Sequence, residues 1–350
     1  MADDTTIALQ GPETPAEASA TAQQPSASAP PQPPKEQVYG AIPSMPTQQG
    51  PEGIRYDFNH GIRLYIPRES ADKEPQLKYT VTFQDYETGV ILFKGDVREG
   101  DYITSIKKYY IPFRIIIQRY GSGEEVLRHD MVLKDRDVIV QIPFATIGDS
   151  FAWFSYVEPF QQKHGCRVIC YMQPQFVELF RKQYPDITFI RKDETLQYTP
   201  YASYYLGLFF NDDVDNQPVD FRLCGLHQHA GYILGLRDKE LADNPPRVDM
   251  SAPRKIREKY CCIATQATSQ CKYWNNPNGW RQVVAFLKDS GYRVLCIDKE
   301  PVHGGGIVWN HMPWGCEDFT GALPLQERID LLKDCDFFVG LPSGLSWMAW

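Results

Sequence analysis

The stretch VIVQIPFATIGDSFAWFSYVEPFQQKHGCRVICY, residues 138–171, decides the fold. It opens with the apolar run Val138-Ile139-Val140, passes a Gly-Asp turn, continues through a segment over residues 150–164 that can form a helix, and ends in a second apolar run. Two buried strands joined by a helix pair side by side as parallel strands. The stretch therefore predicts a parallel sheet with helices on both faces.

The same alternation of strands and helices continues along the chain. The expected elements are a helix over 174–184, a strand over 188–190, and then a second series with strands at 261–264, 293–297 and 336–340 and helices at 279–290 and 324–333. Two such series predict two Rossmann-like halves with a cleft between them. We expect residues 141–250 to form the first half and 251–350 to form the second.

The residues before this region have a different pattern. Alternating apolar residues over 51–140 predict an antiparallel β domain, with one hairpin around residues 85–89 and another around the glycines at 121–123. Residues 1–50 are rich in Pro, Ala, Ser, Thr and Gln, and bury too little apolar surface to offset the entropy of ordering. We expect this tail to be disordered. The fold class is thus α/β with an N-terminal all-β domain.

Composition limits the function classes. The chain of 350 residues is 43% hydrophobic, with a net charge of −8; this acidic balance argues against nucleic acid as a partner. No run of eighteen apolar residues predicts a membrane span, and the first thirty residues do not resemble a secretory signal. The nine cysteines contain no C-x-x-C pair, which favours reduced thiols, a cytoplasmic location and no metal site.

The first candidate for chemistry is Asp149. It follows the first strand of the first half, at the carboxyl edge of the sheet, where α/β folds place their ligands. A carboxylate there can act as a general base. It can also simply cap the helix that begins at this turn. The position of Asp149 alone leaves both roles open.

Two further segments are candidates for binding a diphosphate. A polar loop with a single lysine follows the first strand of the second half. Its hydroxyl groups, side-chain amide and lysine ammonium could bind phosphate oxygens. The segment could equally be an ordinary surface loop with no ligand. A Gly/Ser turn precedes the last helix, where free backbone N–H groups bind phosphate. The candidate residues are Thr265, Gln266 and Lys272 in the loop, and Ser343, Gly344, Leu345 and Ser346 in the turn.

Other motifs are weaker. The chain has no Walker-type G-K-[ST] and no complete G-x-G-x-x-G, which argues against an ATPase or a dehydrogenase. His227 and His229 are two positions apart, so on a helix they point in different directions and do not share a metal ion.

Taken together, the three segments resemble the heptosyltransferase pattern. Gly148-Asp149, Lys272-Tyr273-Trp274 and Ser343-Gly344-Leu345-Ser346 occur in the same order as the corresponding motifs of that group. The segment around Asp149 and the preceding β domain are most similar to those of the bacterial autotransporter heptosyltransferases. The resemblance covers residues 51–350.

The resemblance implies a GT-B fold with an added β domain. It implies inverting, metal-independent transfer of heptose from ADP-heptose to serine hydroxyls of an autotransporter adhesin passenger, in the cytoplasm. Asp149 would be the base, Lys272 would contact the diphosphate, and the other candidates would bind the nucleotide sugar. The resemblance also implies that transfer itself requires no cofactor and that members form large homo-oligomers. It further implies an iron-binding segment, which we expect beyond residue 350 and absent here.

Two other functions stay open. One is a glycosyltransferase of the lipopolysaccharide core type, with another donor or a lipid-linked acceptor. The other is a non-catalytic adaptor. Residues 343–350 read as the opening of a helix with little to pack against, so we expect an incomplete second half and a truncated chain, which would favour the adaptor.

Overall fold

The computed structural model describes residues 42–72, 74–106, 110–194, 198–210, 214–305 and 308–350. Most of the predicted tail, residues 1–41, lies outside them. The end of that tail differs from the prediction, because Gln48–Gln49 form a short strand, β1, paired with β2 (Arg55–Asn59). Thr47 anchors this strand: its N–H donates to the buried Asp57 over 3.0 Å, and its hydroxyl donates to the Pro200 carbonyl over 2.7 Å.

The N-terminal region contains the two predicted hairpins. β4 and β5 pair across the turn at residues 86–90, and β7 and β8 pair across the glycine turn, giving an antiparallel sheet in the order β5-β4-β7-β8. The strands and the short 3₁₀ helix of this region are η1 (Pro51–Gly53), β3 (Arg63–Tyr65), β4 (Leu77–Asp85), β5 (Ile91–Arg98), β6 (Tyr102–Thr104), β7 (Phe113–Arg119) and β8 (Glu125–Asp130).

A second sheet crosses the boundary that the sequence placed at residue 140. Its order is β11-β10-β9-β12-β2-β3-β6, with β12 parallel to both β9 and β2. The N-terminal strands β2, β3 and β6 thus extend the parallel sheet of the first half. The strands and helices of this half are β9 (Asp137–Ile142), α1 (Ile147–Phe154), α2 (Val157–His164), β10 (Arg167–Met172), α3 (Pro174–Phe180), β11 (Thr188–Arg191), β12 (Ala202–Tyr205) and α4 (Leu226–Ile233), with 3₁₀ turns η2 (Val214–Asn216), η3 (Phe221–Leu223) and η4 (Asp238–Glu240).

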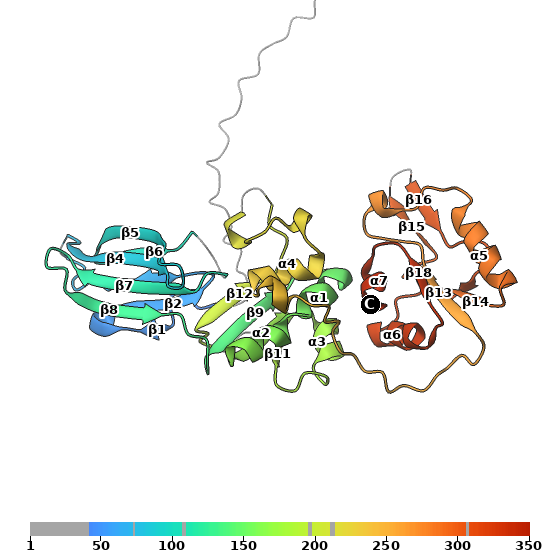
Figure 1. Cartoon of the computed structure of the whole chain (residues 1–350), viewed down its shortest axis with the longest axis horizontal. Helices are drawn as coiled ribbons and strands as arrows, with labels where there is room; N and C mark the ends of the chain where they lie inside the picture. The colour runs from blue at the N-terminus through green and yellow to red at the C-terminus, as the bar shows by residue number, and fades with distance from the viewer. Residues whose placement is uncertain (1–41, 73, 107–109, 195–197, 211–213, 306–307) are drawn as a thin grey trace, which may run out of the picture. The chain divides into compact units, whose positions relative to one another are not determined.

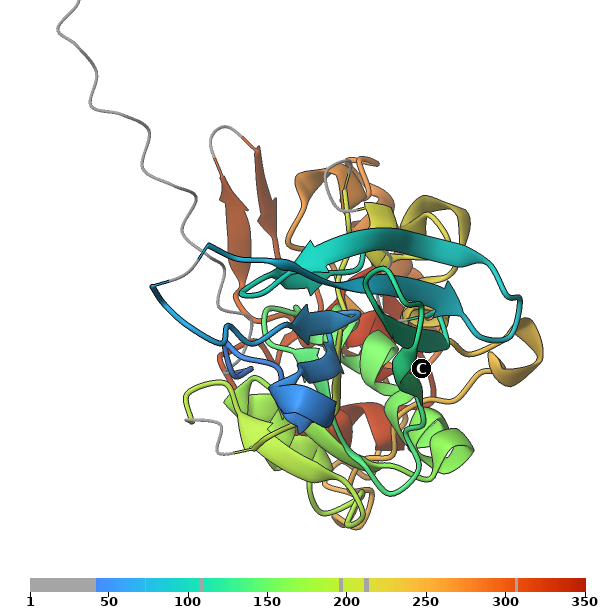
Figure 2. The same cartoon turned by 90° about the vertical axis from the view of Figure 1, so that its left-hand side faces the viewer.

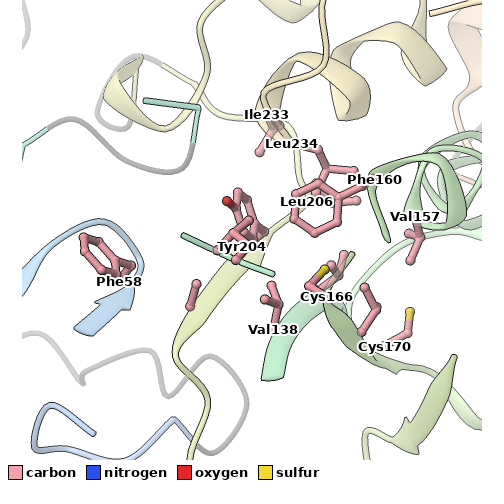
Figure 3. Close-up of a cluster of buried hydrophobic side chains, with 14 of the residues drawn as sticks. Phe58, Val138, Val157, Phe160, Cys166, Cys170, Tyr204, Leu206, Ile233 and Leu234 are labelled. Atoms are coloured by element: carbon pink, nitrogen blue, oxygen red, sulfur yellow. The ribbon is translucent and has the colours of Figure 1, made fainter. Parts of the chain in front are cut away.

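The helix expected over residues 150–164 is two helices. The Ser155 hydroxyl donates to the Ala152 carbonyl over 2.6 Å, and Tyr156 is buried with its hydroxyl donating to the Ala242 carbonyl over 3.1 Å. Burying Tyr156 against the 240s segment redirects the chain between α1 and α2. A single large core joins this half to the β region, and Figure 3 shows part of it, with Phe58, Val138, Phe160 and Tyr204 among its labelled side chains.

The second half is a smaller parallel sheet, β17-β14-β13-β18, with helices on both faces. Val284 and Leu287 of α5 pack on one face with Cys261, and Leu331 of α6 packs on the other with Tyr260 (Figure 1). The elements are β13 (Tyr260–Ala264), η5 (Gln270–Lys272), α5 (Gly279–Asp289), β14 (Arg293–Cys296), β15 (Val302–Gly305), β16 (Val308–His311), β17 (Glu317–Asp318), α6 (Leu325–Asp334), β18 (Phe338–Gly340) and α7 (Gly344–Met348).

The antiparallel pair β15 and β16 is a separate ribbon, visible in Figure 2. Residues 241–259, all of them described, contain neither helix nor strand, and the predicted division at residue 250 falls among them. The predicted fold class, an N-terminal β region followed by two Rossmann-like halves, is confirmed.

Candidate functional site

The first predicted motif lies in a helix rather than in the turn before it. Thr146 is the N-cap of α1, so Gly148 and Asp149 belong to its first turn. Asp149 reaches back to Thr146 and accepts its N–H over 3.1 Å and its hydroxyl over 2.8 Å. This is the acidic half of a capping box.

Both of these hydrogen bonds end on one oxygen of Asp149, Oδ2. In the described part of the chain, no hydrogen bond uses the other oxygen, Oδ1. The side chain is half-buried. A carboxylate in this state can cap its helix through one oxygen and accept a proton through the other. The two roles that the sequence left open are therefore compatible.

The third motif packs directly on the first. A Cβ placed on Gly344 would lie 2.6 Å from the Ile147 Cβ, and one placed on Gly148 would lie 2.8 Å from Cδ1 of Trp347. Such distances are too short for any side chain larger than hydrogen. The two glycines are thus what lets α1 and α7 approach closely. The structure brings Asp149 and the turn at 343–346 together, although nearly two hundred residues separate them in sequence.

The turn itself is less open than the sequence predicted. Ile147 covers Gly344, Leu345 packs against the cluster around Tyr260, and the Ser346 hydroxyl donates to the Leu341 carbonyl. The hydroxyl of Ser343 is buried and has no hydrogen-bond partner among the described residues. Ser343 is therefore the residue of this turn whose polar side chain is not committed to the fold.

The second motif divides into a buried part and an exposed part. Thr265 and Gln266 are buried, and their N–H groups donate to Asp298 rather than toward a ligand. The Thr265 hydroxyl and the Gln266 side-chain amide, the groups that the sequence offered as phosphate donors, also have partners within the chain, Asp298 and the Glu300 carbonyl. Lys272, at the end of η5, is exposed, and its ammonium makes no hydrogen bond or ion pair with the described residues.

Trp274 anchors the segment that carries Lys272. Its ring lies so close to Gly279, at the start of α5, that a Cβ there would be 2.5 Å from the ring. It also meets the Trp280 ring edge to face at 5.5 Å. The Lys272-Tyr273-Trp274 segment is thus fixed at its Trp, and its lysine remains accessible.

Sequence reasoning missed Asp298 and Arg328. Asp298 is 2% exposed, and burial raises its pKa. Arg328 is 4% exposed and donates to the backbone carbonyls of Phe319, Asp298 and Gly321, while burial lowers its pKa. One signal could have found Asp298: it follows the apolar run Val294-Leu295-Cys296-Ile297, at the carboxyl edge of the second sheet, which corresponds to the place of Asp149 in the first half.

The two histidines point to different surroundings, as predicted. His227 lies 5.9 Å from the Trp347 ring and 5.3 Å from the Trp350 ring, measured between ring centroids. His229 is buried and bonds Gln217 through Nε2 over 2.9 Å. Burial lowers the pKa of His229 to about 4. Two cavities of the described structure lie where the β region meets the first half, one of about 450 Å³ around His129 and Arg136 and one of about 570 Å³ around Tyr110 and Tyr204. Neither of these two is lined by His227, His229 or a predicted site residue.

Comparison with known proteins decides the family. The family model "Glycosyltransferase TibC, N-terminal domain" matches residues 50–121, and "Glycosyltransferase family 9 (heptosyltransferase)" matches residues 220–350. The chain is 50% identical over 308 residues to the autotransporter heptosyltransferase Aah of Escherichia coli, covering 88% of this chain and 76% of Aah. The chain belongs to the autotransporter heptosyltransferase family. It is therefore related to glycosyltransferases along most of its described length.

Two other members of the family bear on the site. The crystal structure of a dodecameric, iron-containing heptosyltransferase TibC in complex with ADP-D-β-D-heptose is similar to this chain with a TM-score of 0.83 and 49% identity, covering 89% of this chain and 78% of TibC. BimC of Burkholderia thailandensis, described as an inactive autotransporter heptosyltransferase, is 33% identical over 308 residues, covering 87% of this chain and 69% of BimC. The family thus includes one member whose structure contains a nucleotide sugar and another member that is described as inactive.

TibC corrects the cofactor prediction. We expected no cofactor, but the TibC that binds ADP-heptose is iron-containing. Among the described residues of this chain, no group of three or more His, Cys, Asp and Glu side chains could hold a metal ion. These residues therefore do not fit an iron site. Within the same described residues, no helix is long and apolar enough to span a membrane.

Proposed function

We propose that this chain is a protein O-heptosyltransferase that moves heptose from ADP-heptose to serine hydroxyls of an autotransporter passenger, with inversion, in the cytoplasm. Half of the 316 residues that align with TibC are identical to it, and a crystal structure of TibC contains ADP-D-β-D-heptose. The dodecameric state of TibC further suggests a homo-oligomer.

The observation that supports the catalytic role in this proposal is that the two carboxylate oxygens of Asp149 have different surroundings. Oδ2 holds the start of α1, and Oδ1 is unused in the described structure. In the proposed reaction the serine oxygen bonds to C1 of heptose, the bond from C1 to the ADP oxygen breaks, the serine proton moves to Asp149, and ADP leaves. A positioned base of this kind is needed because a serine hydroxyl is a poor nucleophile.

The donor side of the proposal rests on Lys272 and Ser343. Lys272 is an exposed cation on a segment anchored by Trp274, which suits contact with a diphosphate. Ser343 has an unpartnered hydroxyl close to the start of α1. We assign Gly344, Leu345 and Ser346 to the backbone of this turn, and Thr265 and Gln266 to the support of the loop that leads to Lys272.

A second candidate is a non-catalytic member of the family. Its support is the described inactivity of BimC and the cover that Ile147 places over Gly344. A chain of this kind would keep the fold and the capping role of Asp149 without transferring sugar.

The deciding experiment is co-expression with an autotransporter passenger in cells that make ADP-heptose, followed by mass spectrometry of the passenger. The proposal expects heptose on serine residues of the passenger. Passenger without heptose, alongside a folded chain that still binds ADP, would leave the non-catalytic candidate. Hexose in place of heptose would contradict the proposed donor.

A further inference from the structure

The carboxylate of Asp298 joins the carboxyl ends of two parallel strands. β14 leads into Asp298, and the neighbouring strand β13 leads into Thr265 and Gln266. Oδ2 of Asp298 accepts the Thr265 N–H over 2.8 Å and the Thr265 hydroxyl over 3.0 Å, and Oδ1 accepts the Gln266 N–H over 3.2 Å. Three donors of one loop thus converge on a single side chain that is 2% exposed.

The same loop is fixed from two other directions. The side-chain amide of Gln266 donates to the Glu300 carbonyl over 2.7 Å, and the Asn310 amide on β16 donates to the Thr265 carbonyl. Behind Asp298, the guanidinium of Arg328 on α6 donates to the Asp298 carbonyl over 3.0 Å. The loop after β13 is therefore held by β14, by the β15–β16 ribbon and, through Asp298, by α6.

Burying the Asp298 carboxylate costs free energy, and this cost has a purpose if the loop must keep one position. A buried carboxylate loses its hydration, and an apolar side chain would avoid that loss. Asn could not replace Asp298 without change, because one of its two terminal groups is an NH₂ that would face a backbone donor. The three bonds therefore require a carboxylate in its place.

The loop leads to Lys272. Tyr273, next to that lysine, has a buried hydroxyl, and burial together with the negative charge of Asp298 raises its pKa. The segment with the lysine thus lies within electrostatic range of the carboxylate that holds the start of the loop.

We infer that Asp298 is a positioning residue of the donor site, which sets the place of Lys272 by fixing the Thr265-Gln266 loop and touches neither sugar nor acceptor. This inference rests on the proposed function. It adds a residue that acts on donor affinity through another side chain.

The test compares Asp298→Asn with Asp318→Asn in the full chain. Asp318 is a matched control, because its carboxylate also accepts a threonine N–H and hydroxyl, those of Thr320, over 2.9 and 2.7 Å, but near the surface. We measure the affinity for ADP by calorimetry, and KM for ADP-heptose, KM for the passenger and kcat. Asp298→Asn should weaken ADP binding and raise the donor KM about fivefold, less than removal of Lys272 itself, with kcat and the passenger KM within about twofold of wild type; Asp318→Asn should change none of them.

A milder variant keeps the test decisive if Asp298→Asn does not fold. Thr265→Val removes only the hydroxyl bond and should raise the donor KM about threefold. Unchanged donor affinity in a folded Asp298→Asn, or in Thr265→Val where Asp298→Asn does not fold, overturns the inference while leaving the proposed function intact. A fall in kcat together with an equal rise in both KM values also overturns the inference, because such a result indicates a general structural defect. A wild-type chain that binds no ADP contradicts the proposed function itself, and the inference with it.

Discussion

The two halves of the molecule hold their candidate carboxylates in different ways. In the first half, Asp149 binds Thr146, three residues away, and lies on a large apolar core shared with the β region. In the second half, Asp298 binds Thr265, which is 33 residues away, between two small apolar clusters on the faces of the sheet. Each carboxylate accepts the N–H and the hydroxyl of a threonine, but one closes a helix turn and the other joins two strands.

This difference shows what each half depends on. The first half can lose a polar contact near Asp149 because its core is extensive. The second half has few fully buried apolar side chains in each cluster, so its carboxyl edge depends more on the buried polar groups of Asp298 and Arg328. Substitutions should therefore separate stability from catalysis differently in the two halves.

The largest effect is expected at Arg328. Arg328→Met leaves three backbone carbonyls without their donor, and a hydrogen bond from a charged group contributes about 1.5–3 kcal/mol, so the free energy of unfolding should fall by about 3 kcal/mol or more. Urea unfolding should show this loss, and hydrogen exchange should place it in residues 298–321. Arg222→Met is the control, because Arg222 pairs with Asp220 at the surface, where loss of an ion pair changes the free energy of unfolding little. Equal losses in the two variants would contradict the dependence of the second half on its buried network.

The next effect concerns Asp149. Asp149→Asn keeps an oxygen that can accept the Thr146 N–H but removes the basic carboxylate. We expect transfer to the passenger to fall at least about a hundredfold, or about 2.7 kcal/mol in the barrier, with little change in the melting temperature. Asp149→Ala should lose both transfer and about 1 kcal/mol of stability. Near-normal transfer by Asp149→Asn would reduce Asp149 to a cap.

The same comparison shows which features of the fold and the site can be predicted from the sequence. The two hairpins and the strands β9, β10, β13, β14 and β18 follow from local periods and were predicted, whereas β12 and the β15–β16 ribbon were not. Asp149 was predicted to cap α1, and it does so from the first turn of the helix, with Thr146 as the N-cap. The pairing of β2 with β12, the break between α1 and α2, and the bond from Asp298 to Thr265 depend on residues far apart in sequence. No local pattern encodes them. The three candidate segments of the site were predicted from the sequence, but the packing of Ile147 over Gly344 was not.

The third effect is a dependence on pH in the first half. His229 titrates near 6.5 when unfolded, and burial lowers its pKa to about 4 in the fold. Between these values the unfolded state binds more protons, so the free energy of unfolding should fall as the pH drops, by on the order of 2–3 kcal/mol. Urea unfolding from pH 7 to 4.5 should show this slope, and His229→Gln should reduce it. His303→Gln, on the β15–β16 ribbon, should leave it unchanged.

The smallest effect is expected at Lys272, and it tests the exposed end of the second half's loop. Lys272 is exposed, so its contact with a diphosphate should be at the low end for a charged hydrogen bond, about 1.5 kcal/mol. Lys272→Ala should thus weaken ADP binding roughly tenfold without changing the melting temperature. Lys272→Arg should not restore full affinity, because a planar guanidinium does not reproduce the point charge of an ammonium. Lys288→Ala is the control, because Lys288 lies in the same half and donates to the Gly315 carbonyl. If Lys272→Ala binds ADP as wild type does, Lys272 is a surface residue, the inferred role of Asp298 fails with it, and Ser343, in the turn before α7, becomes the first donor-site residue to test.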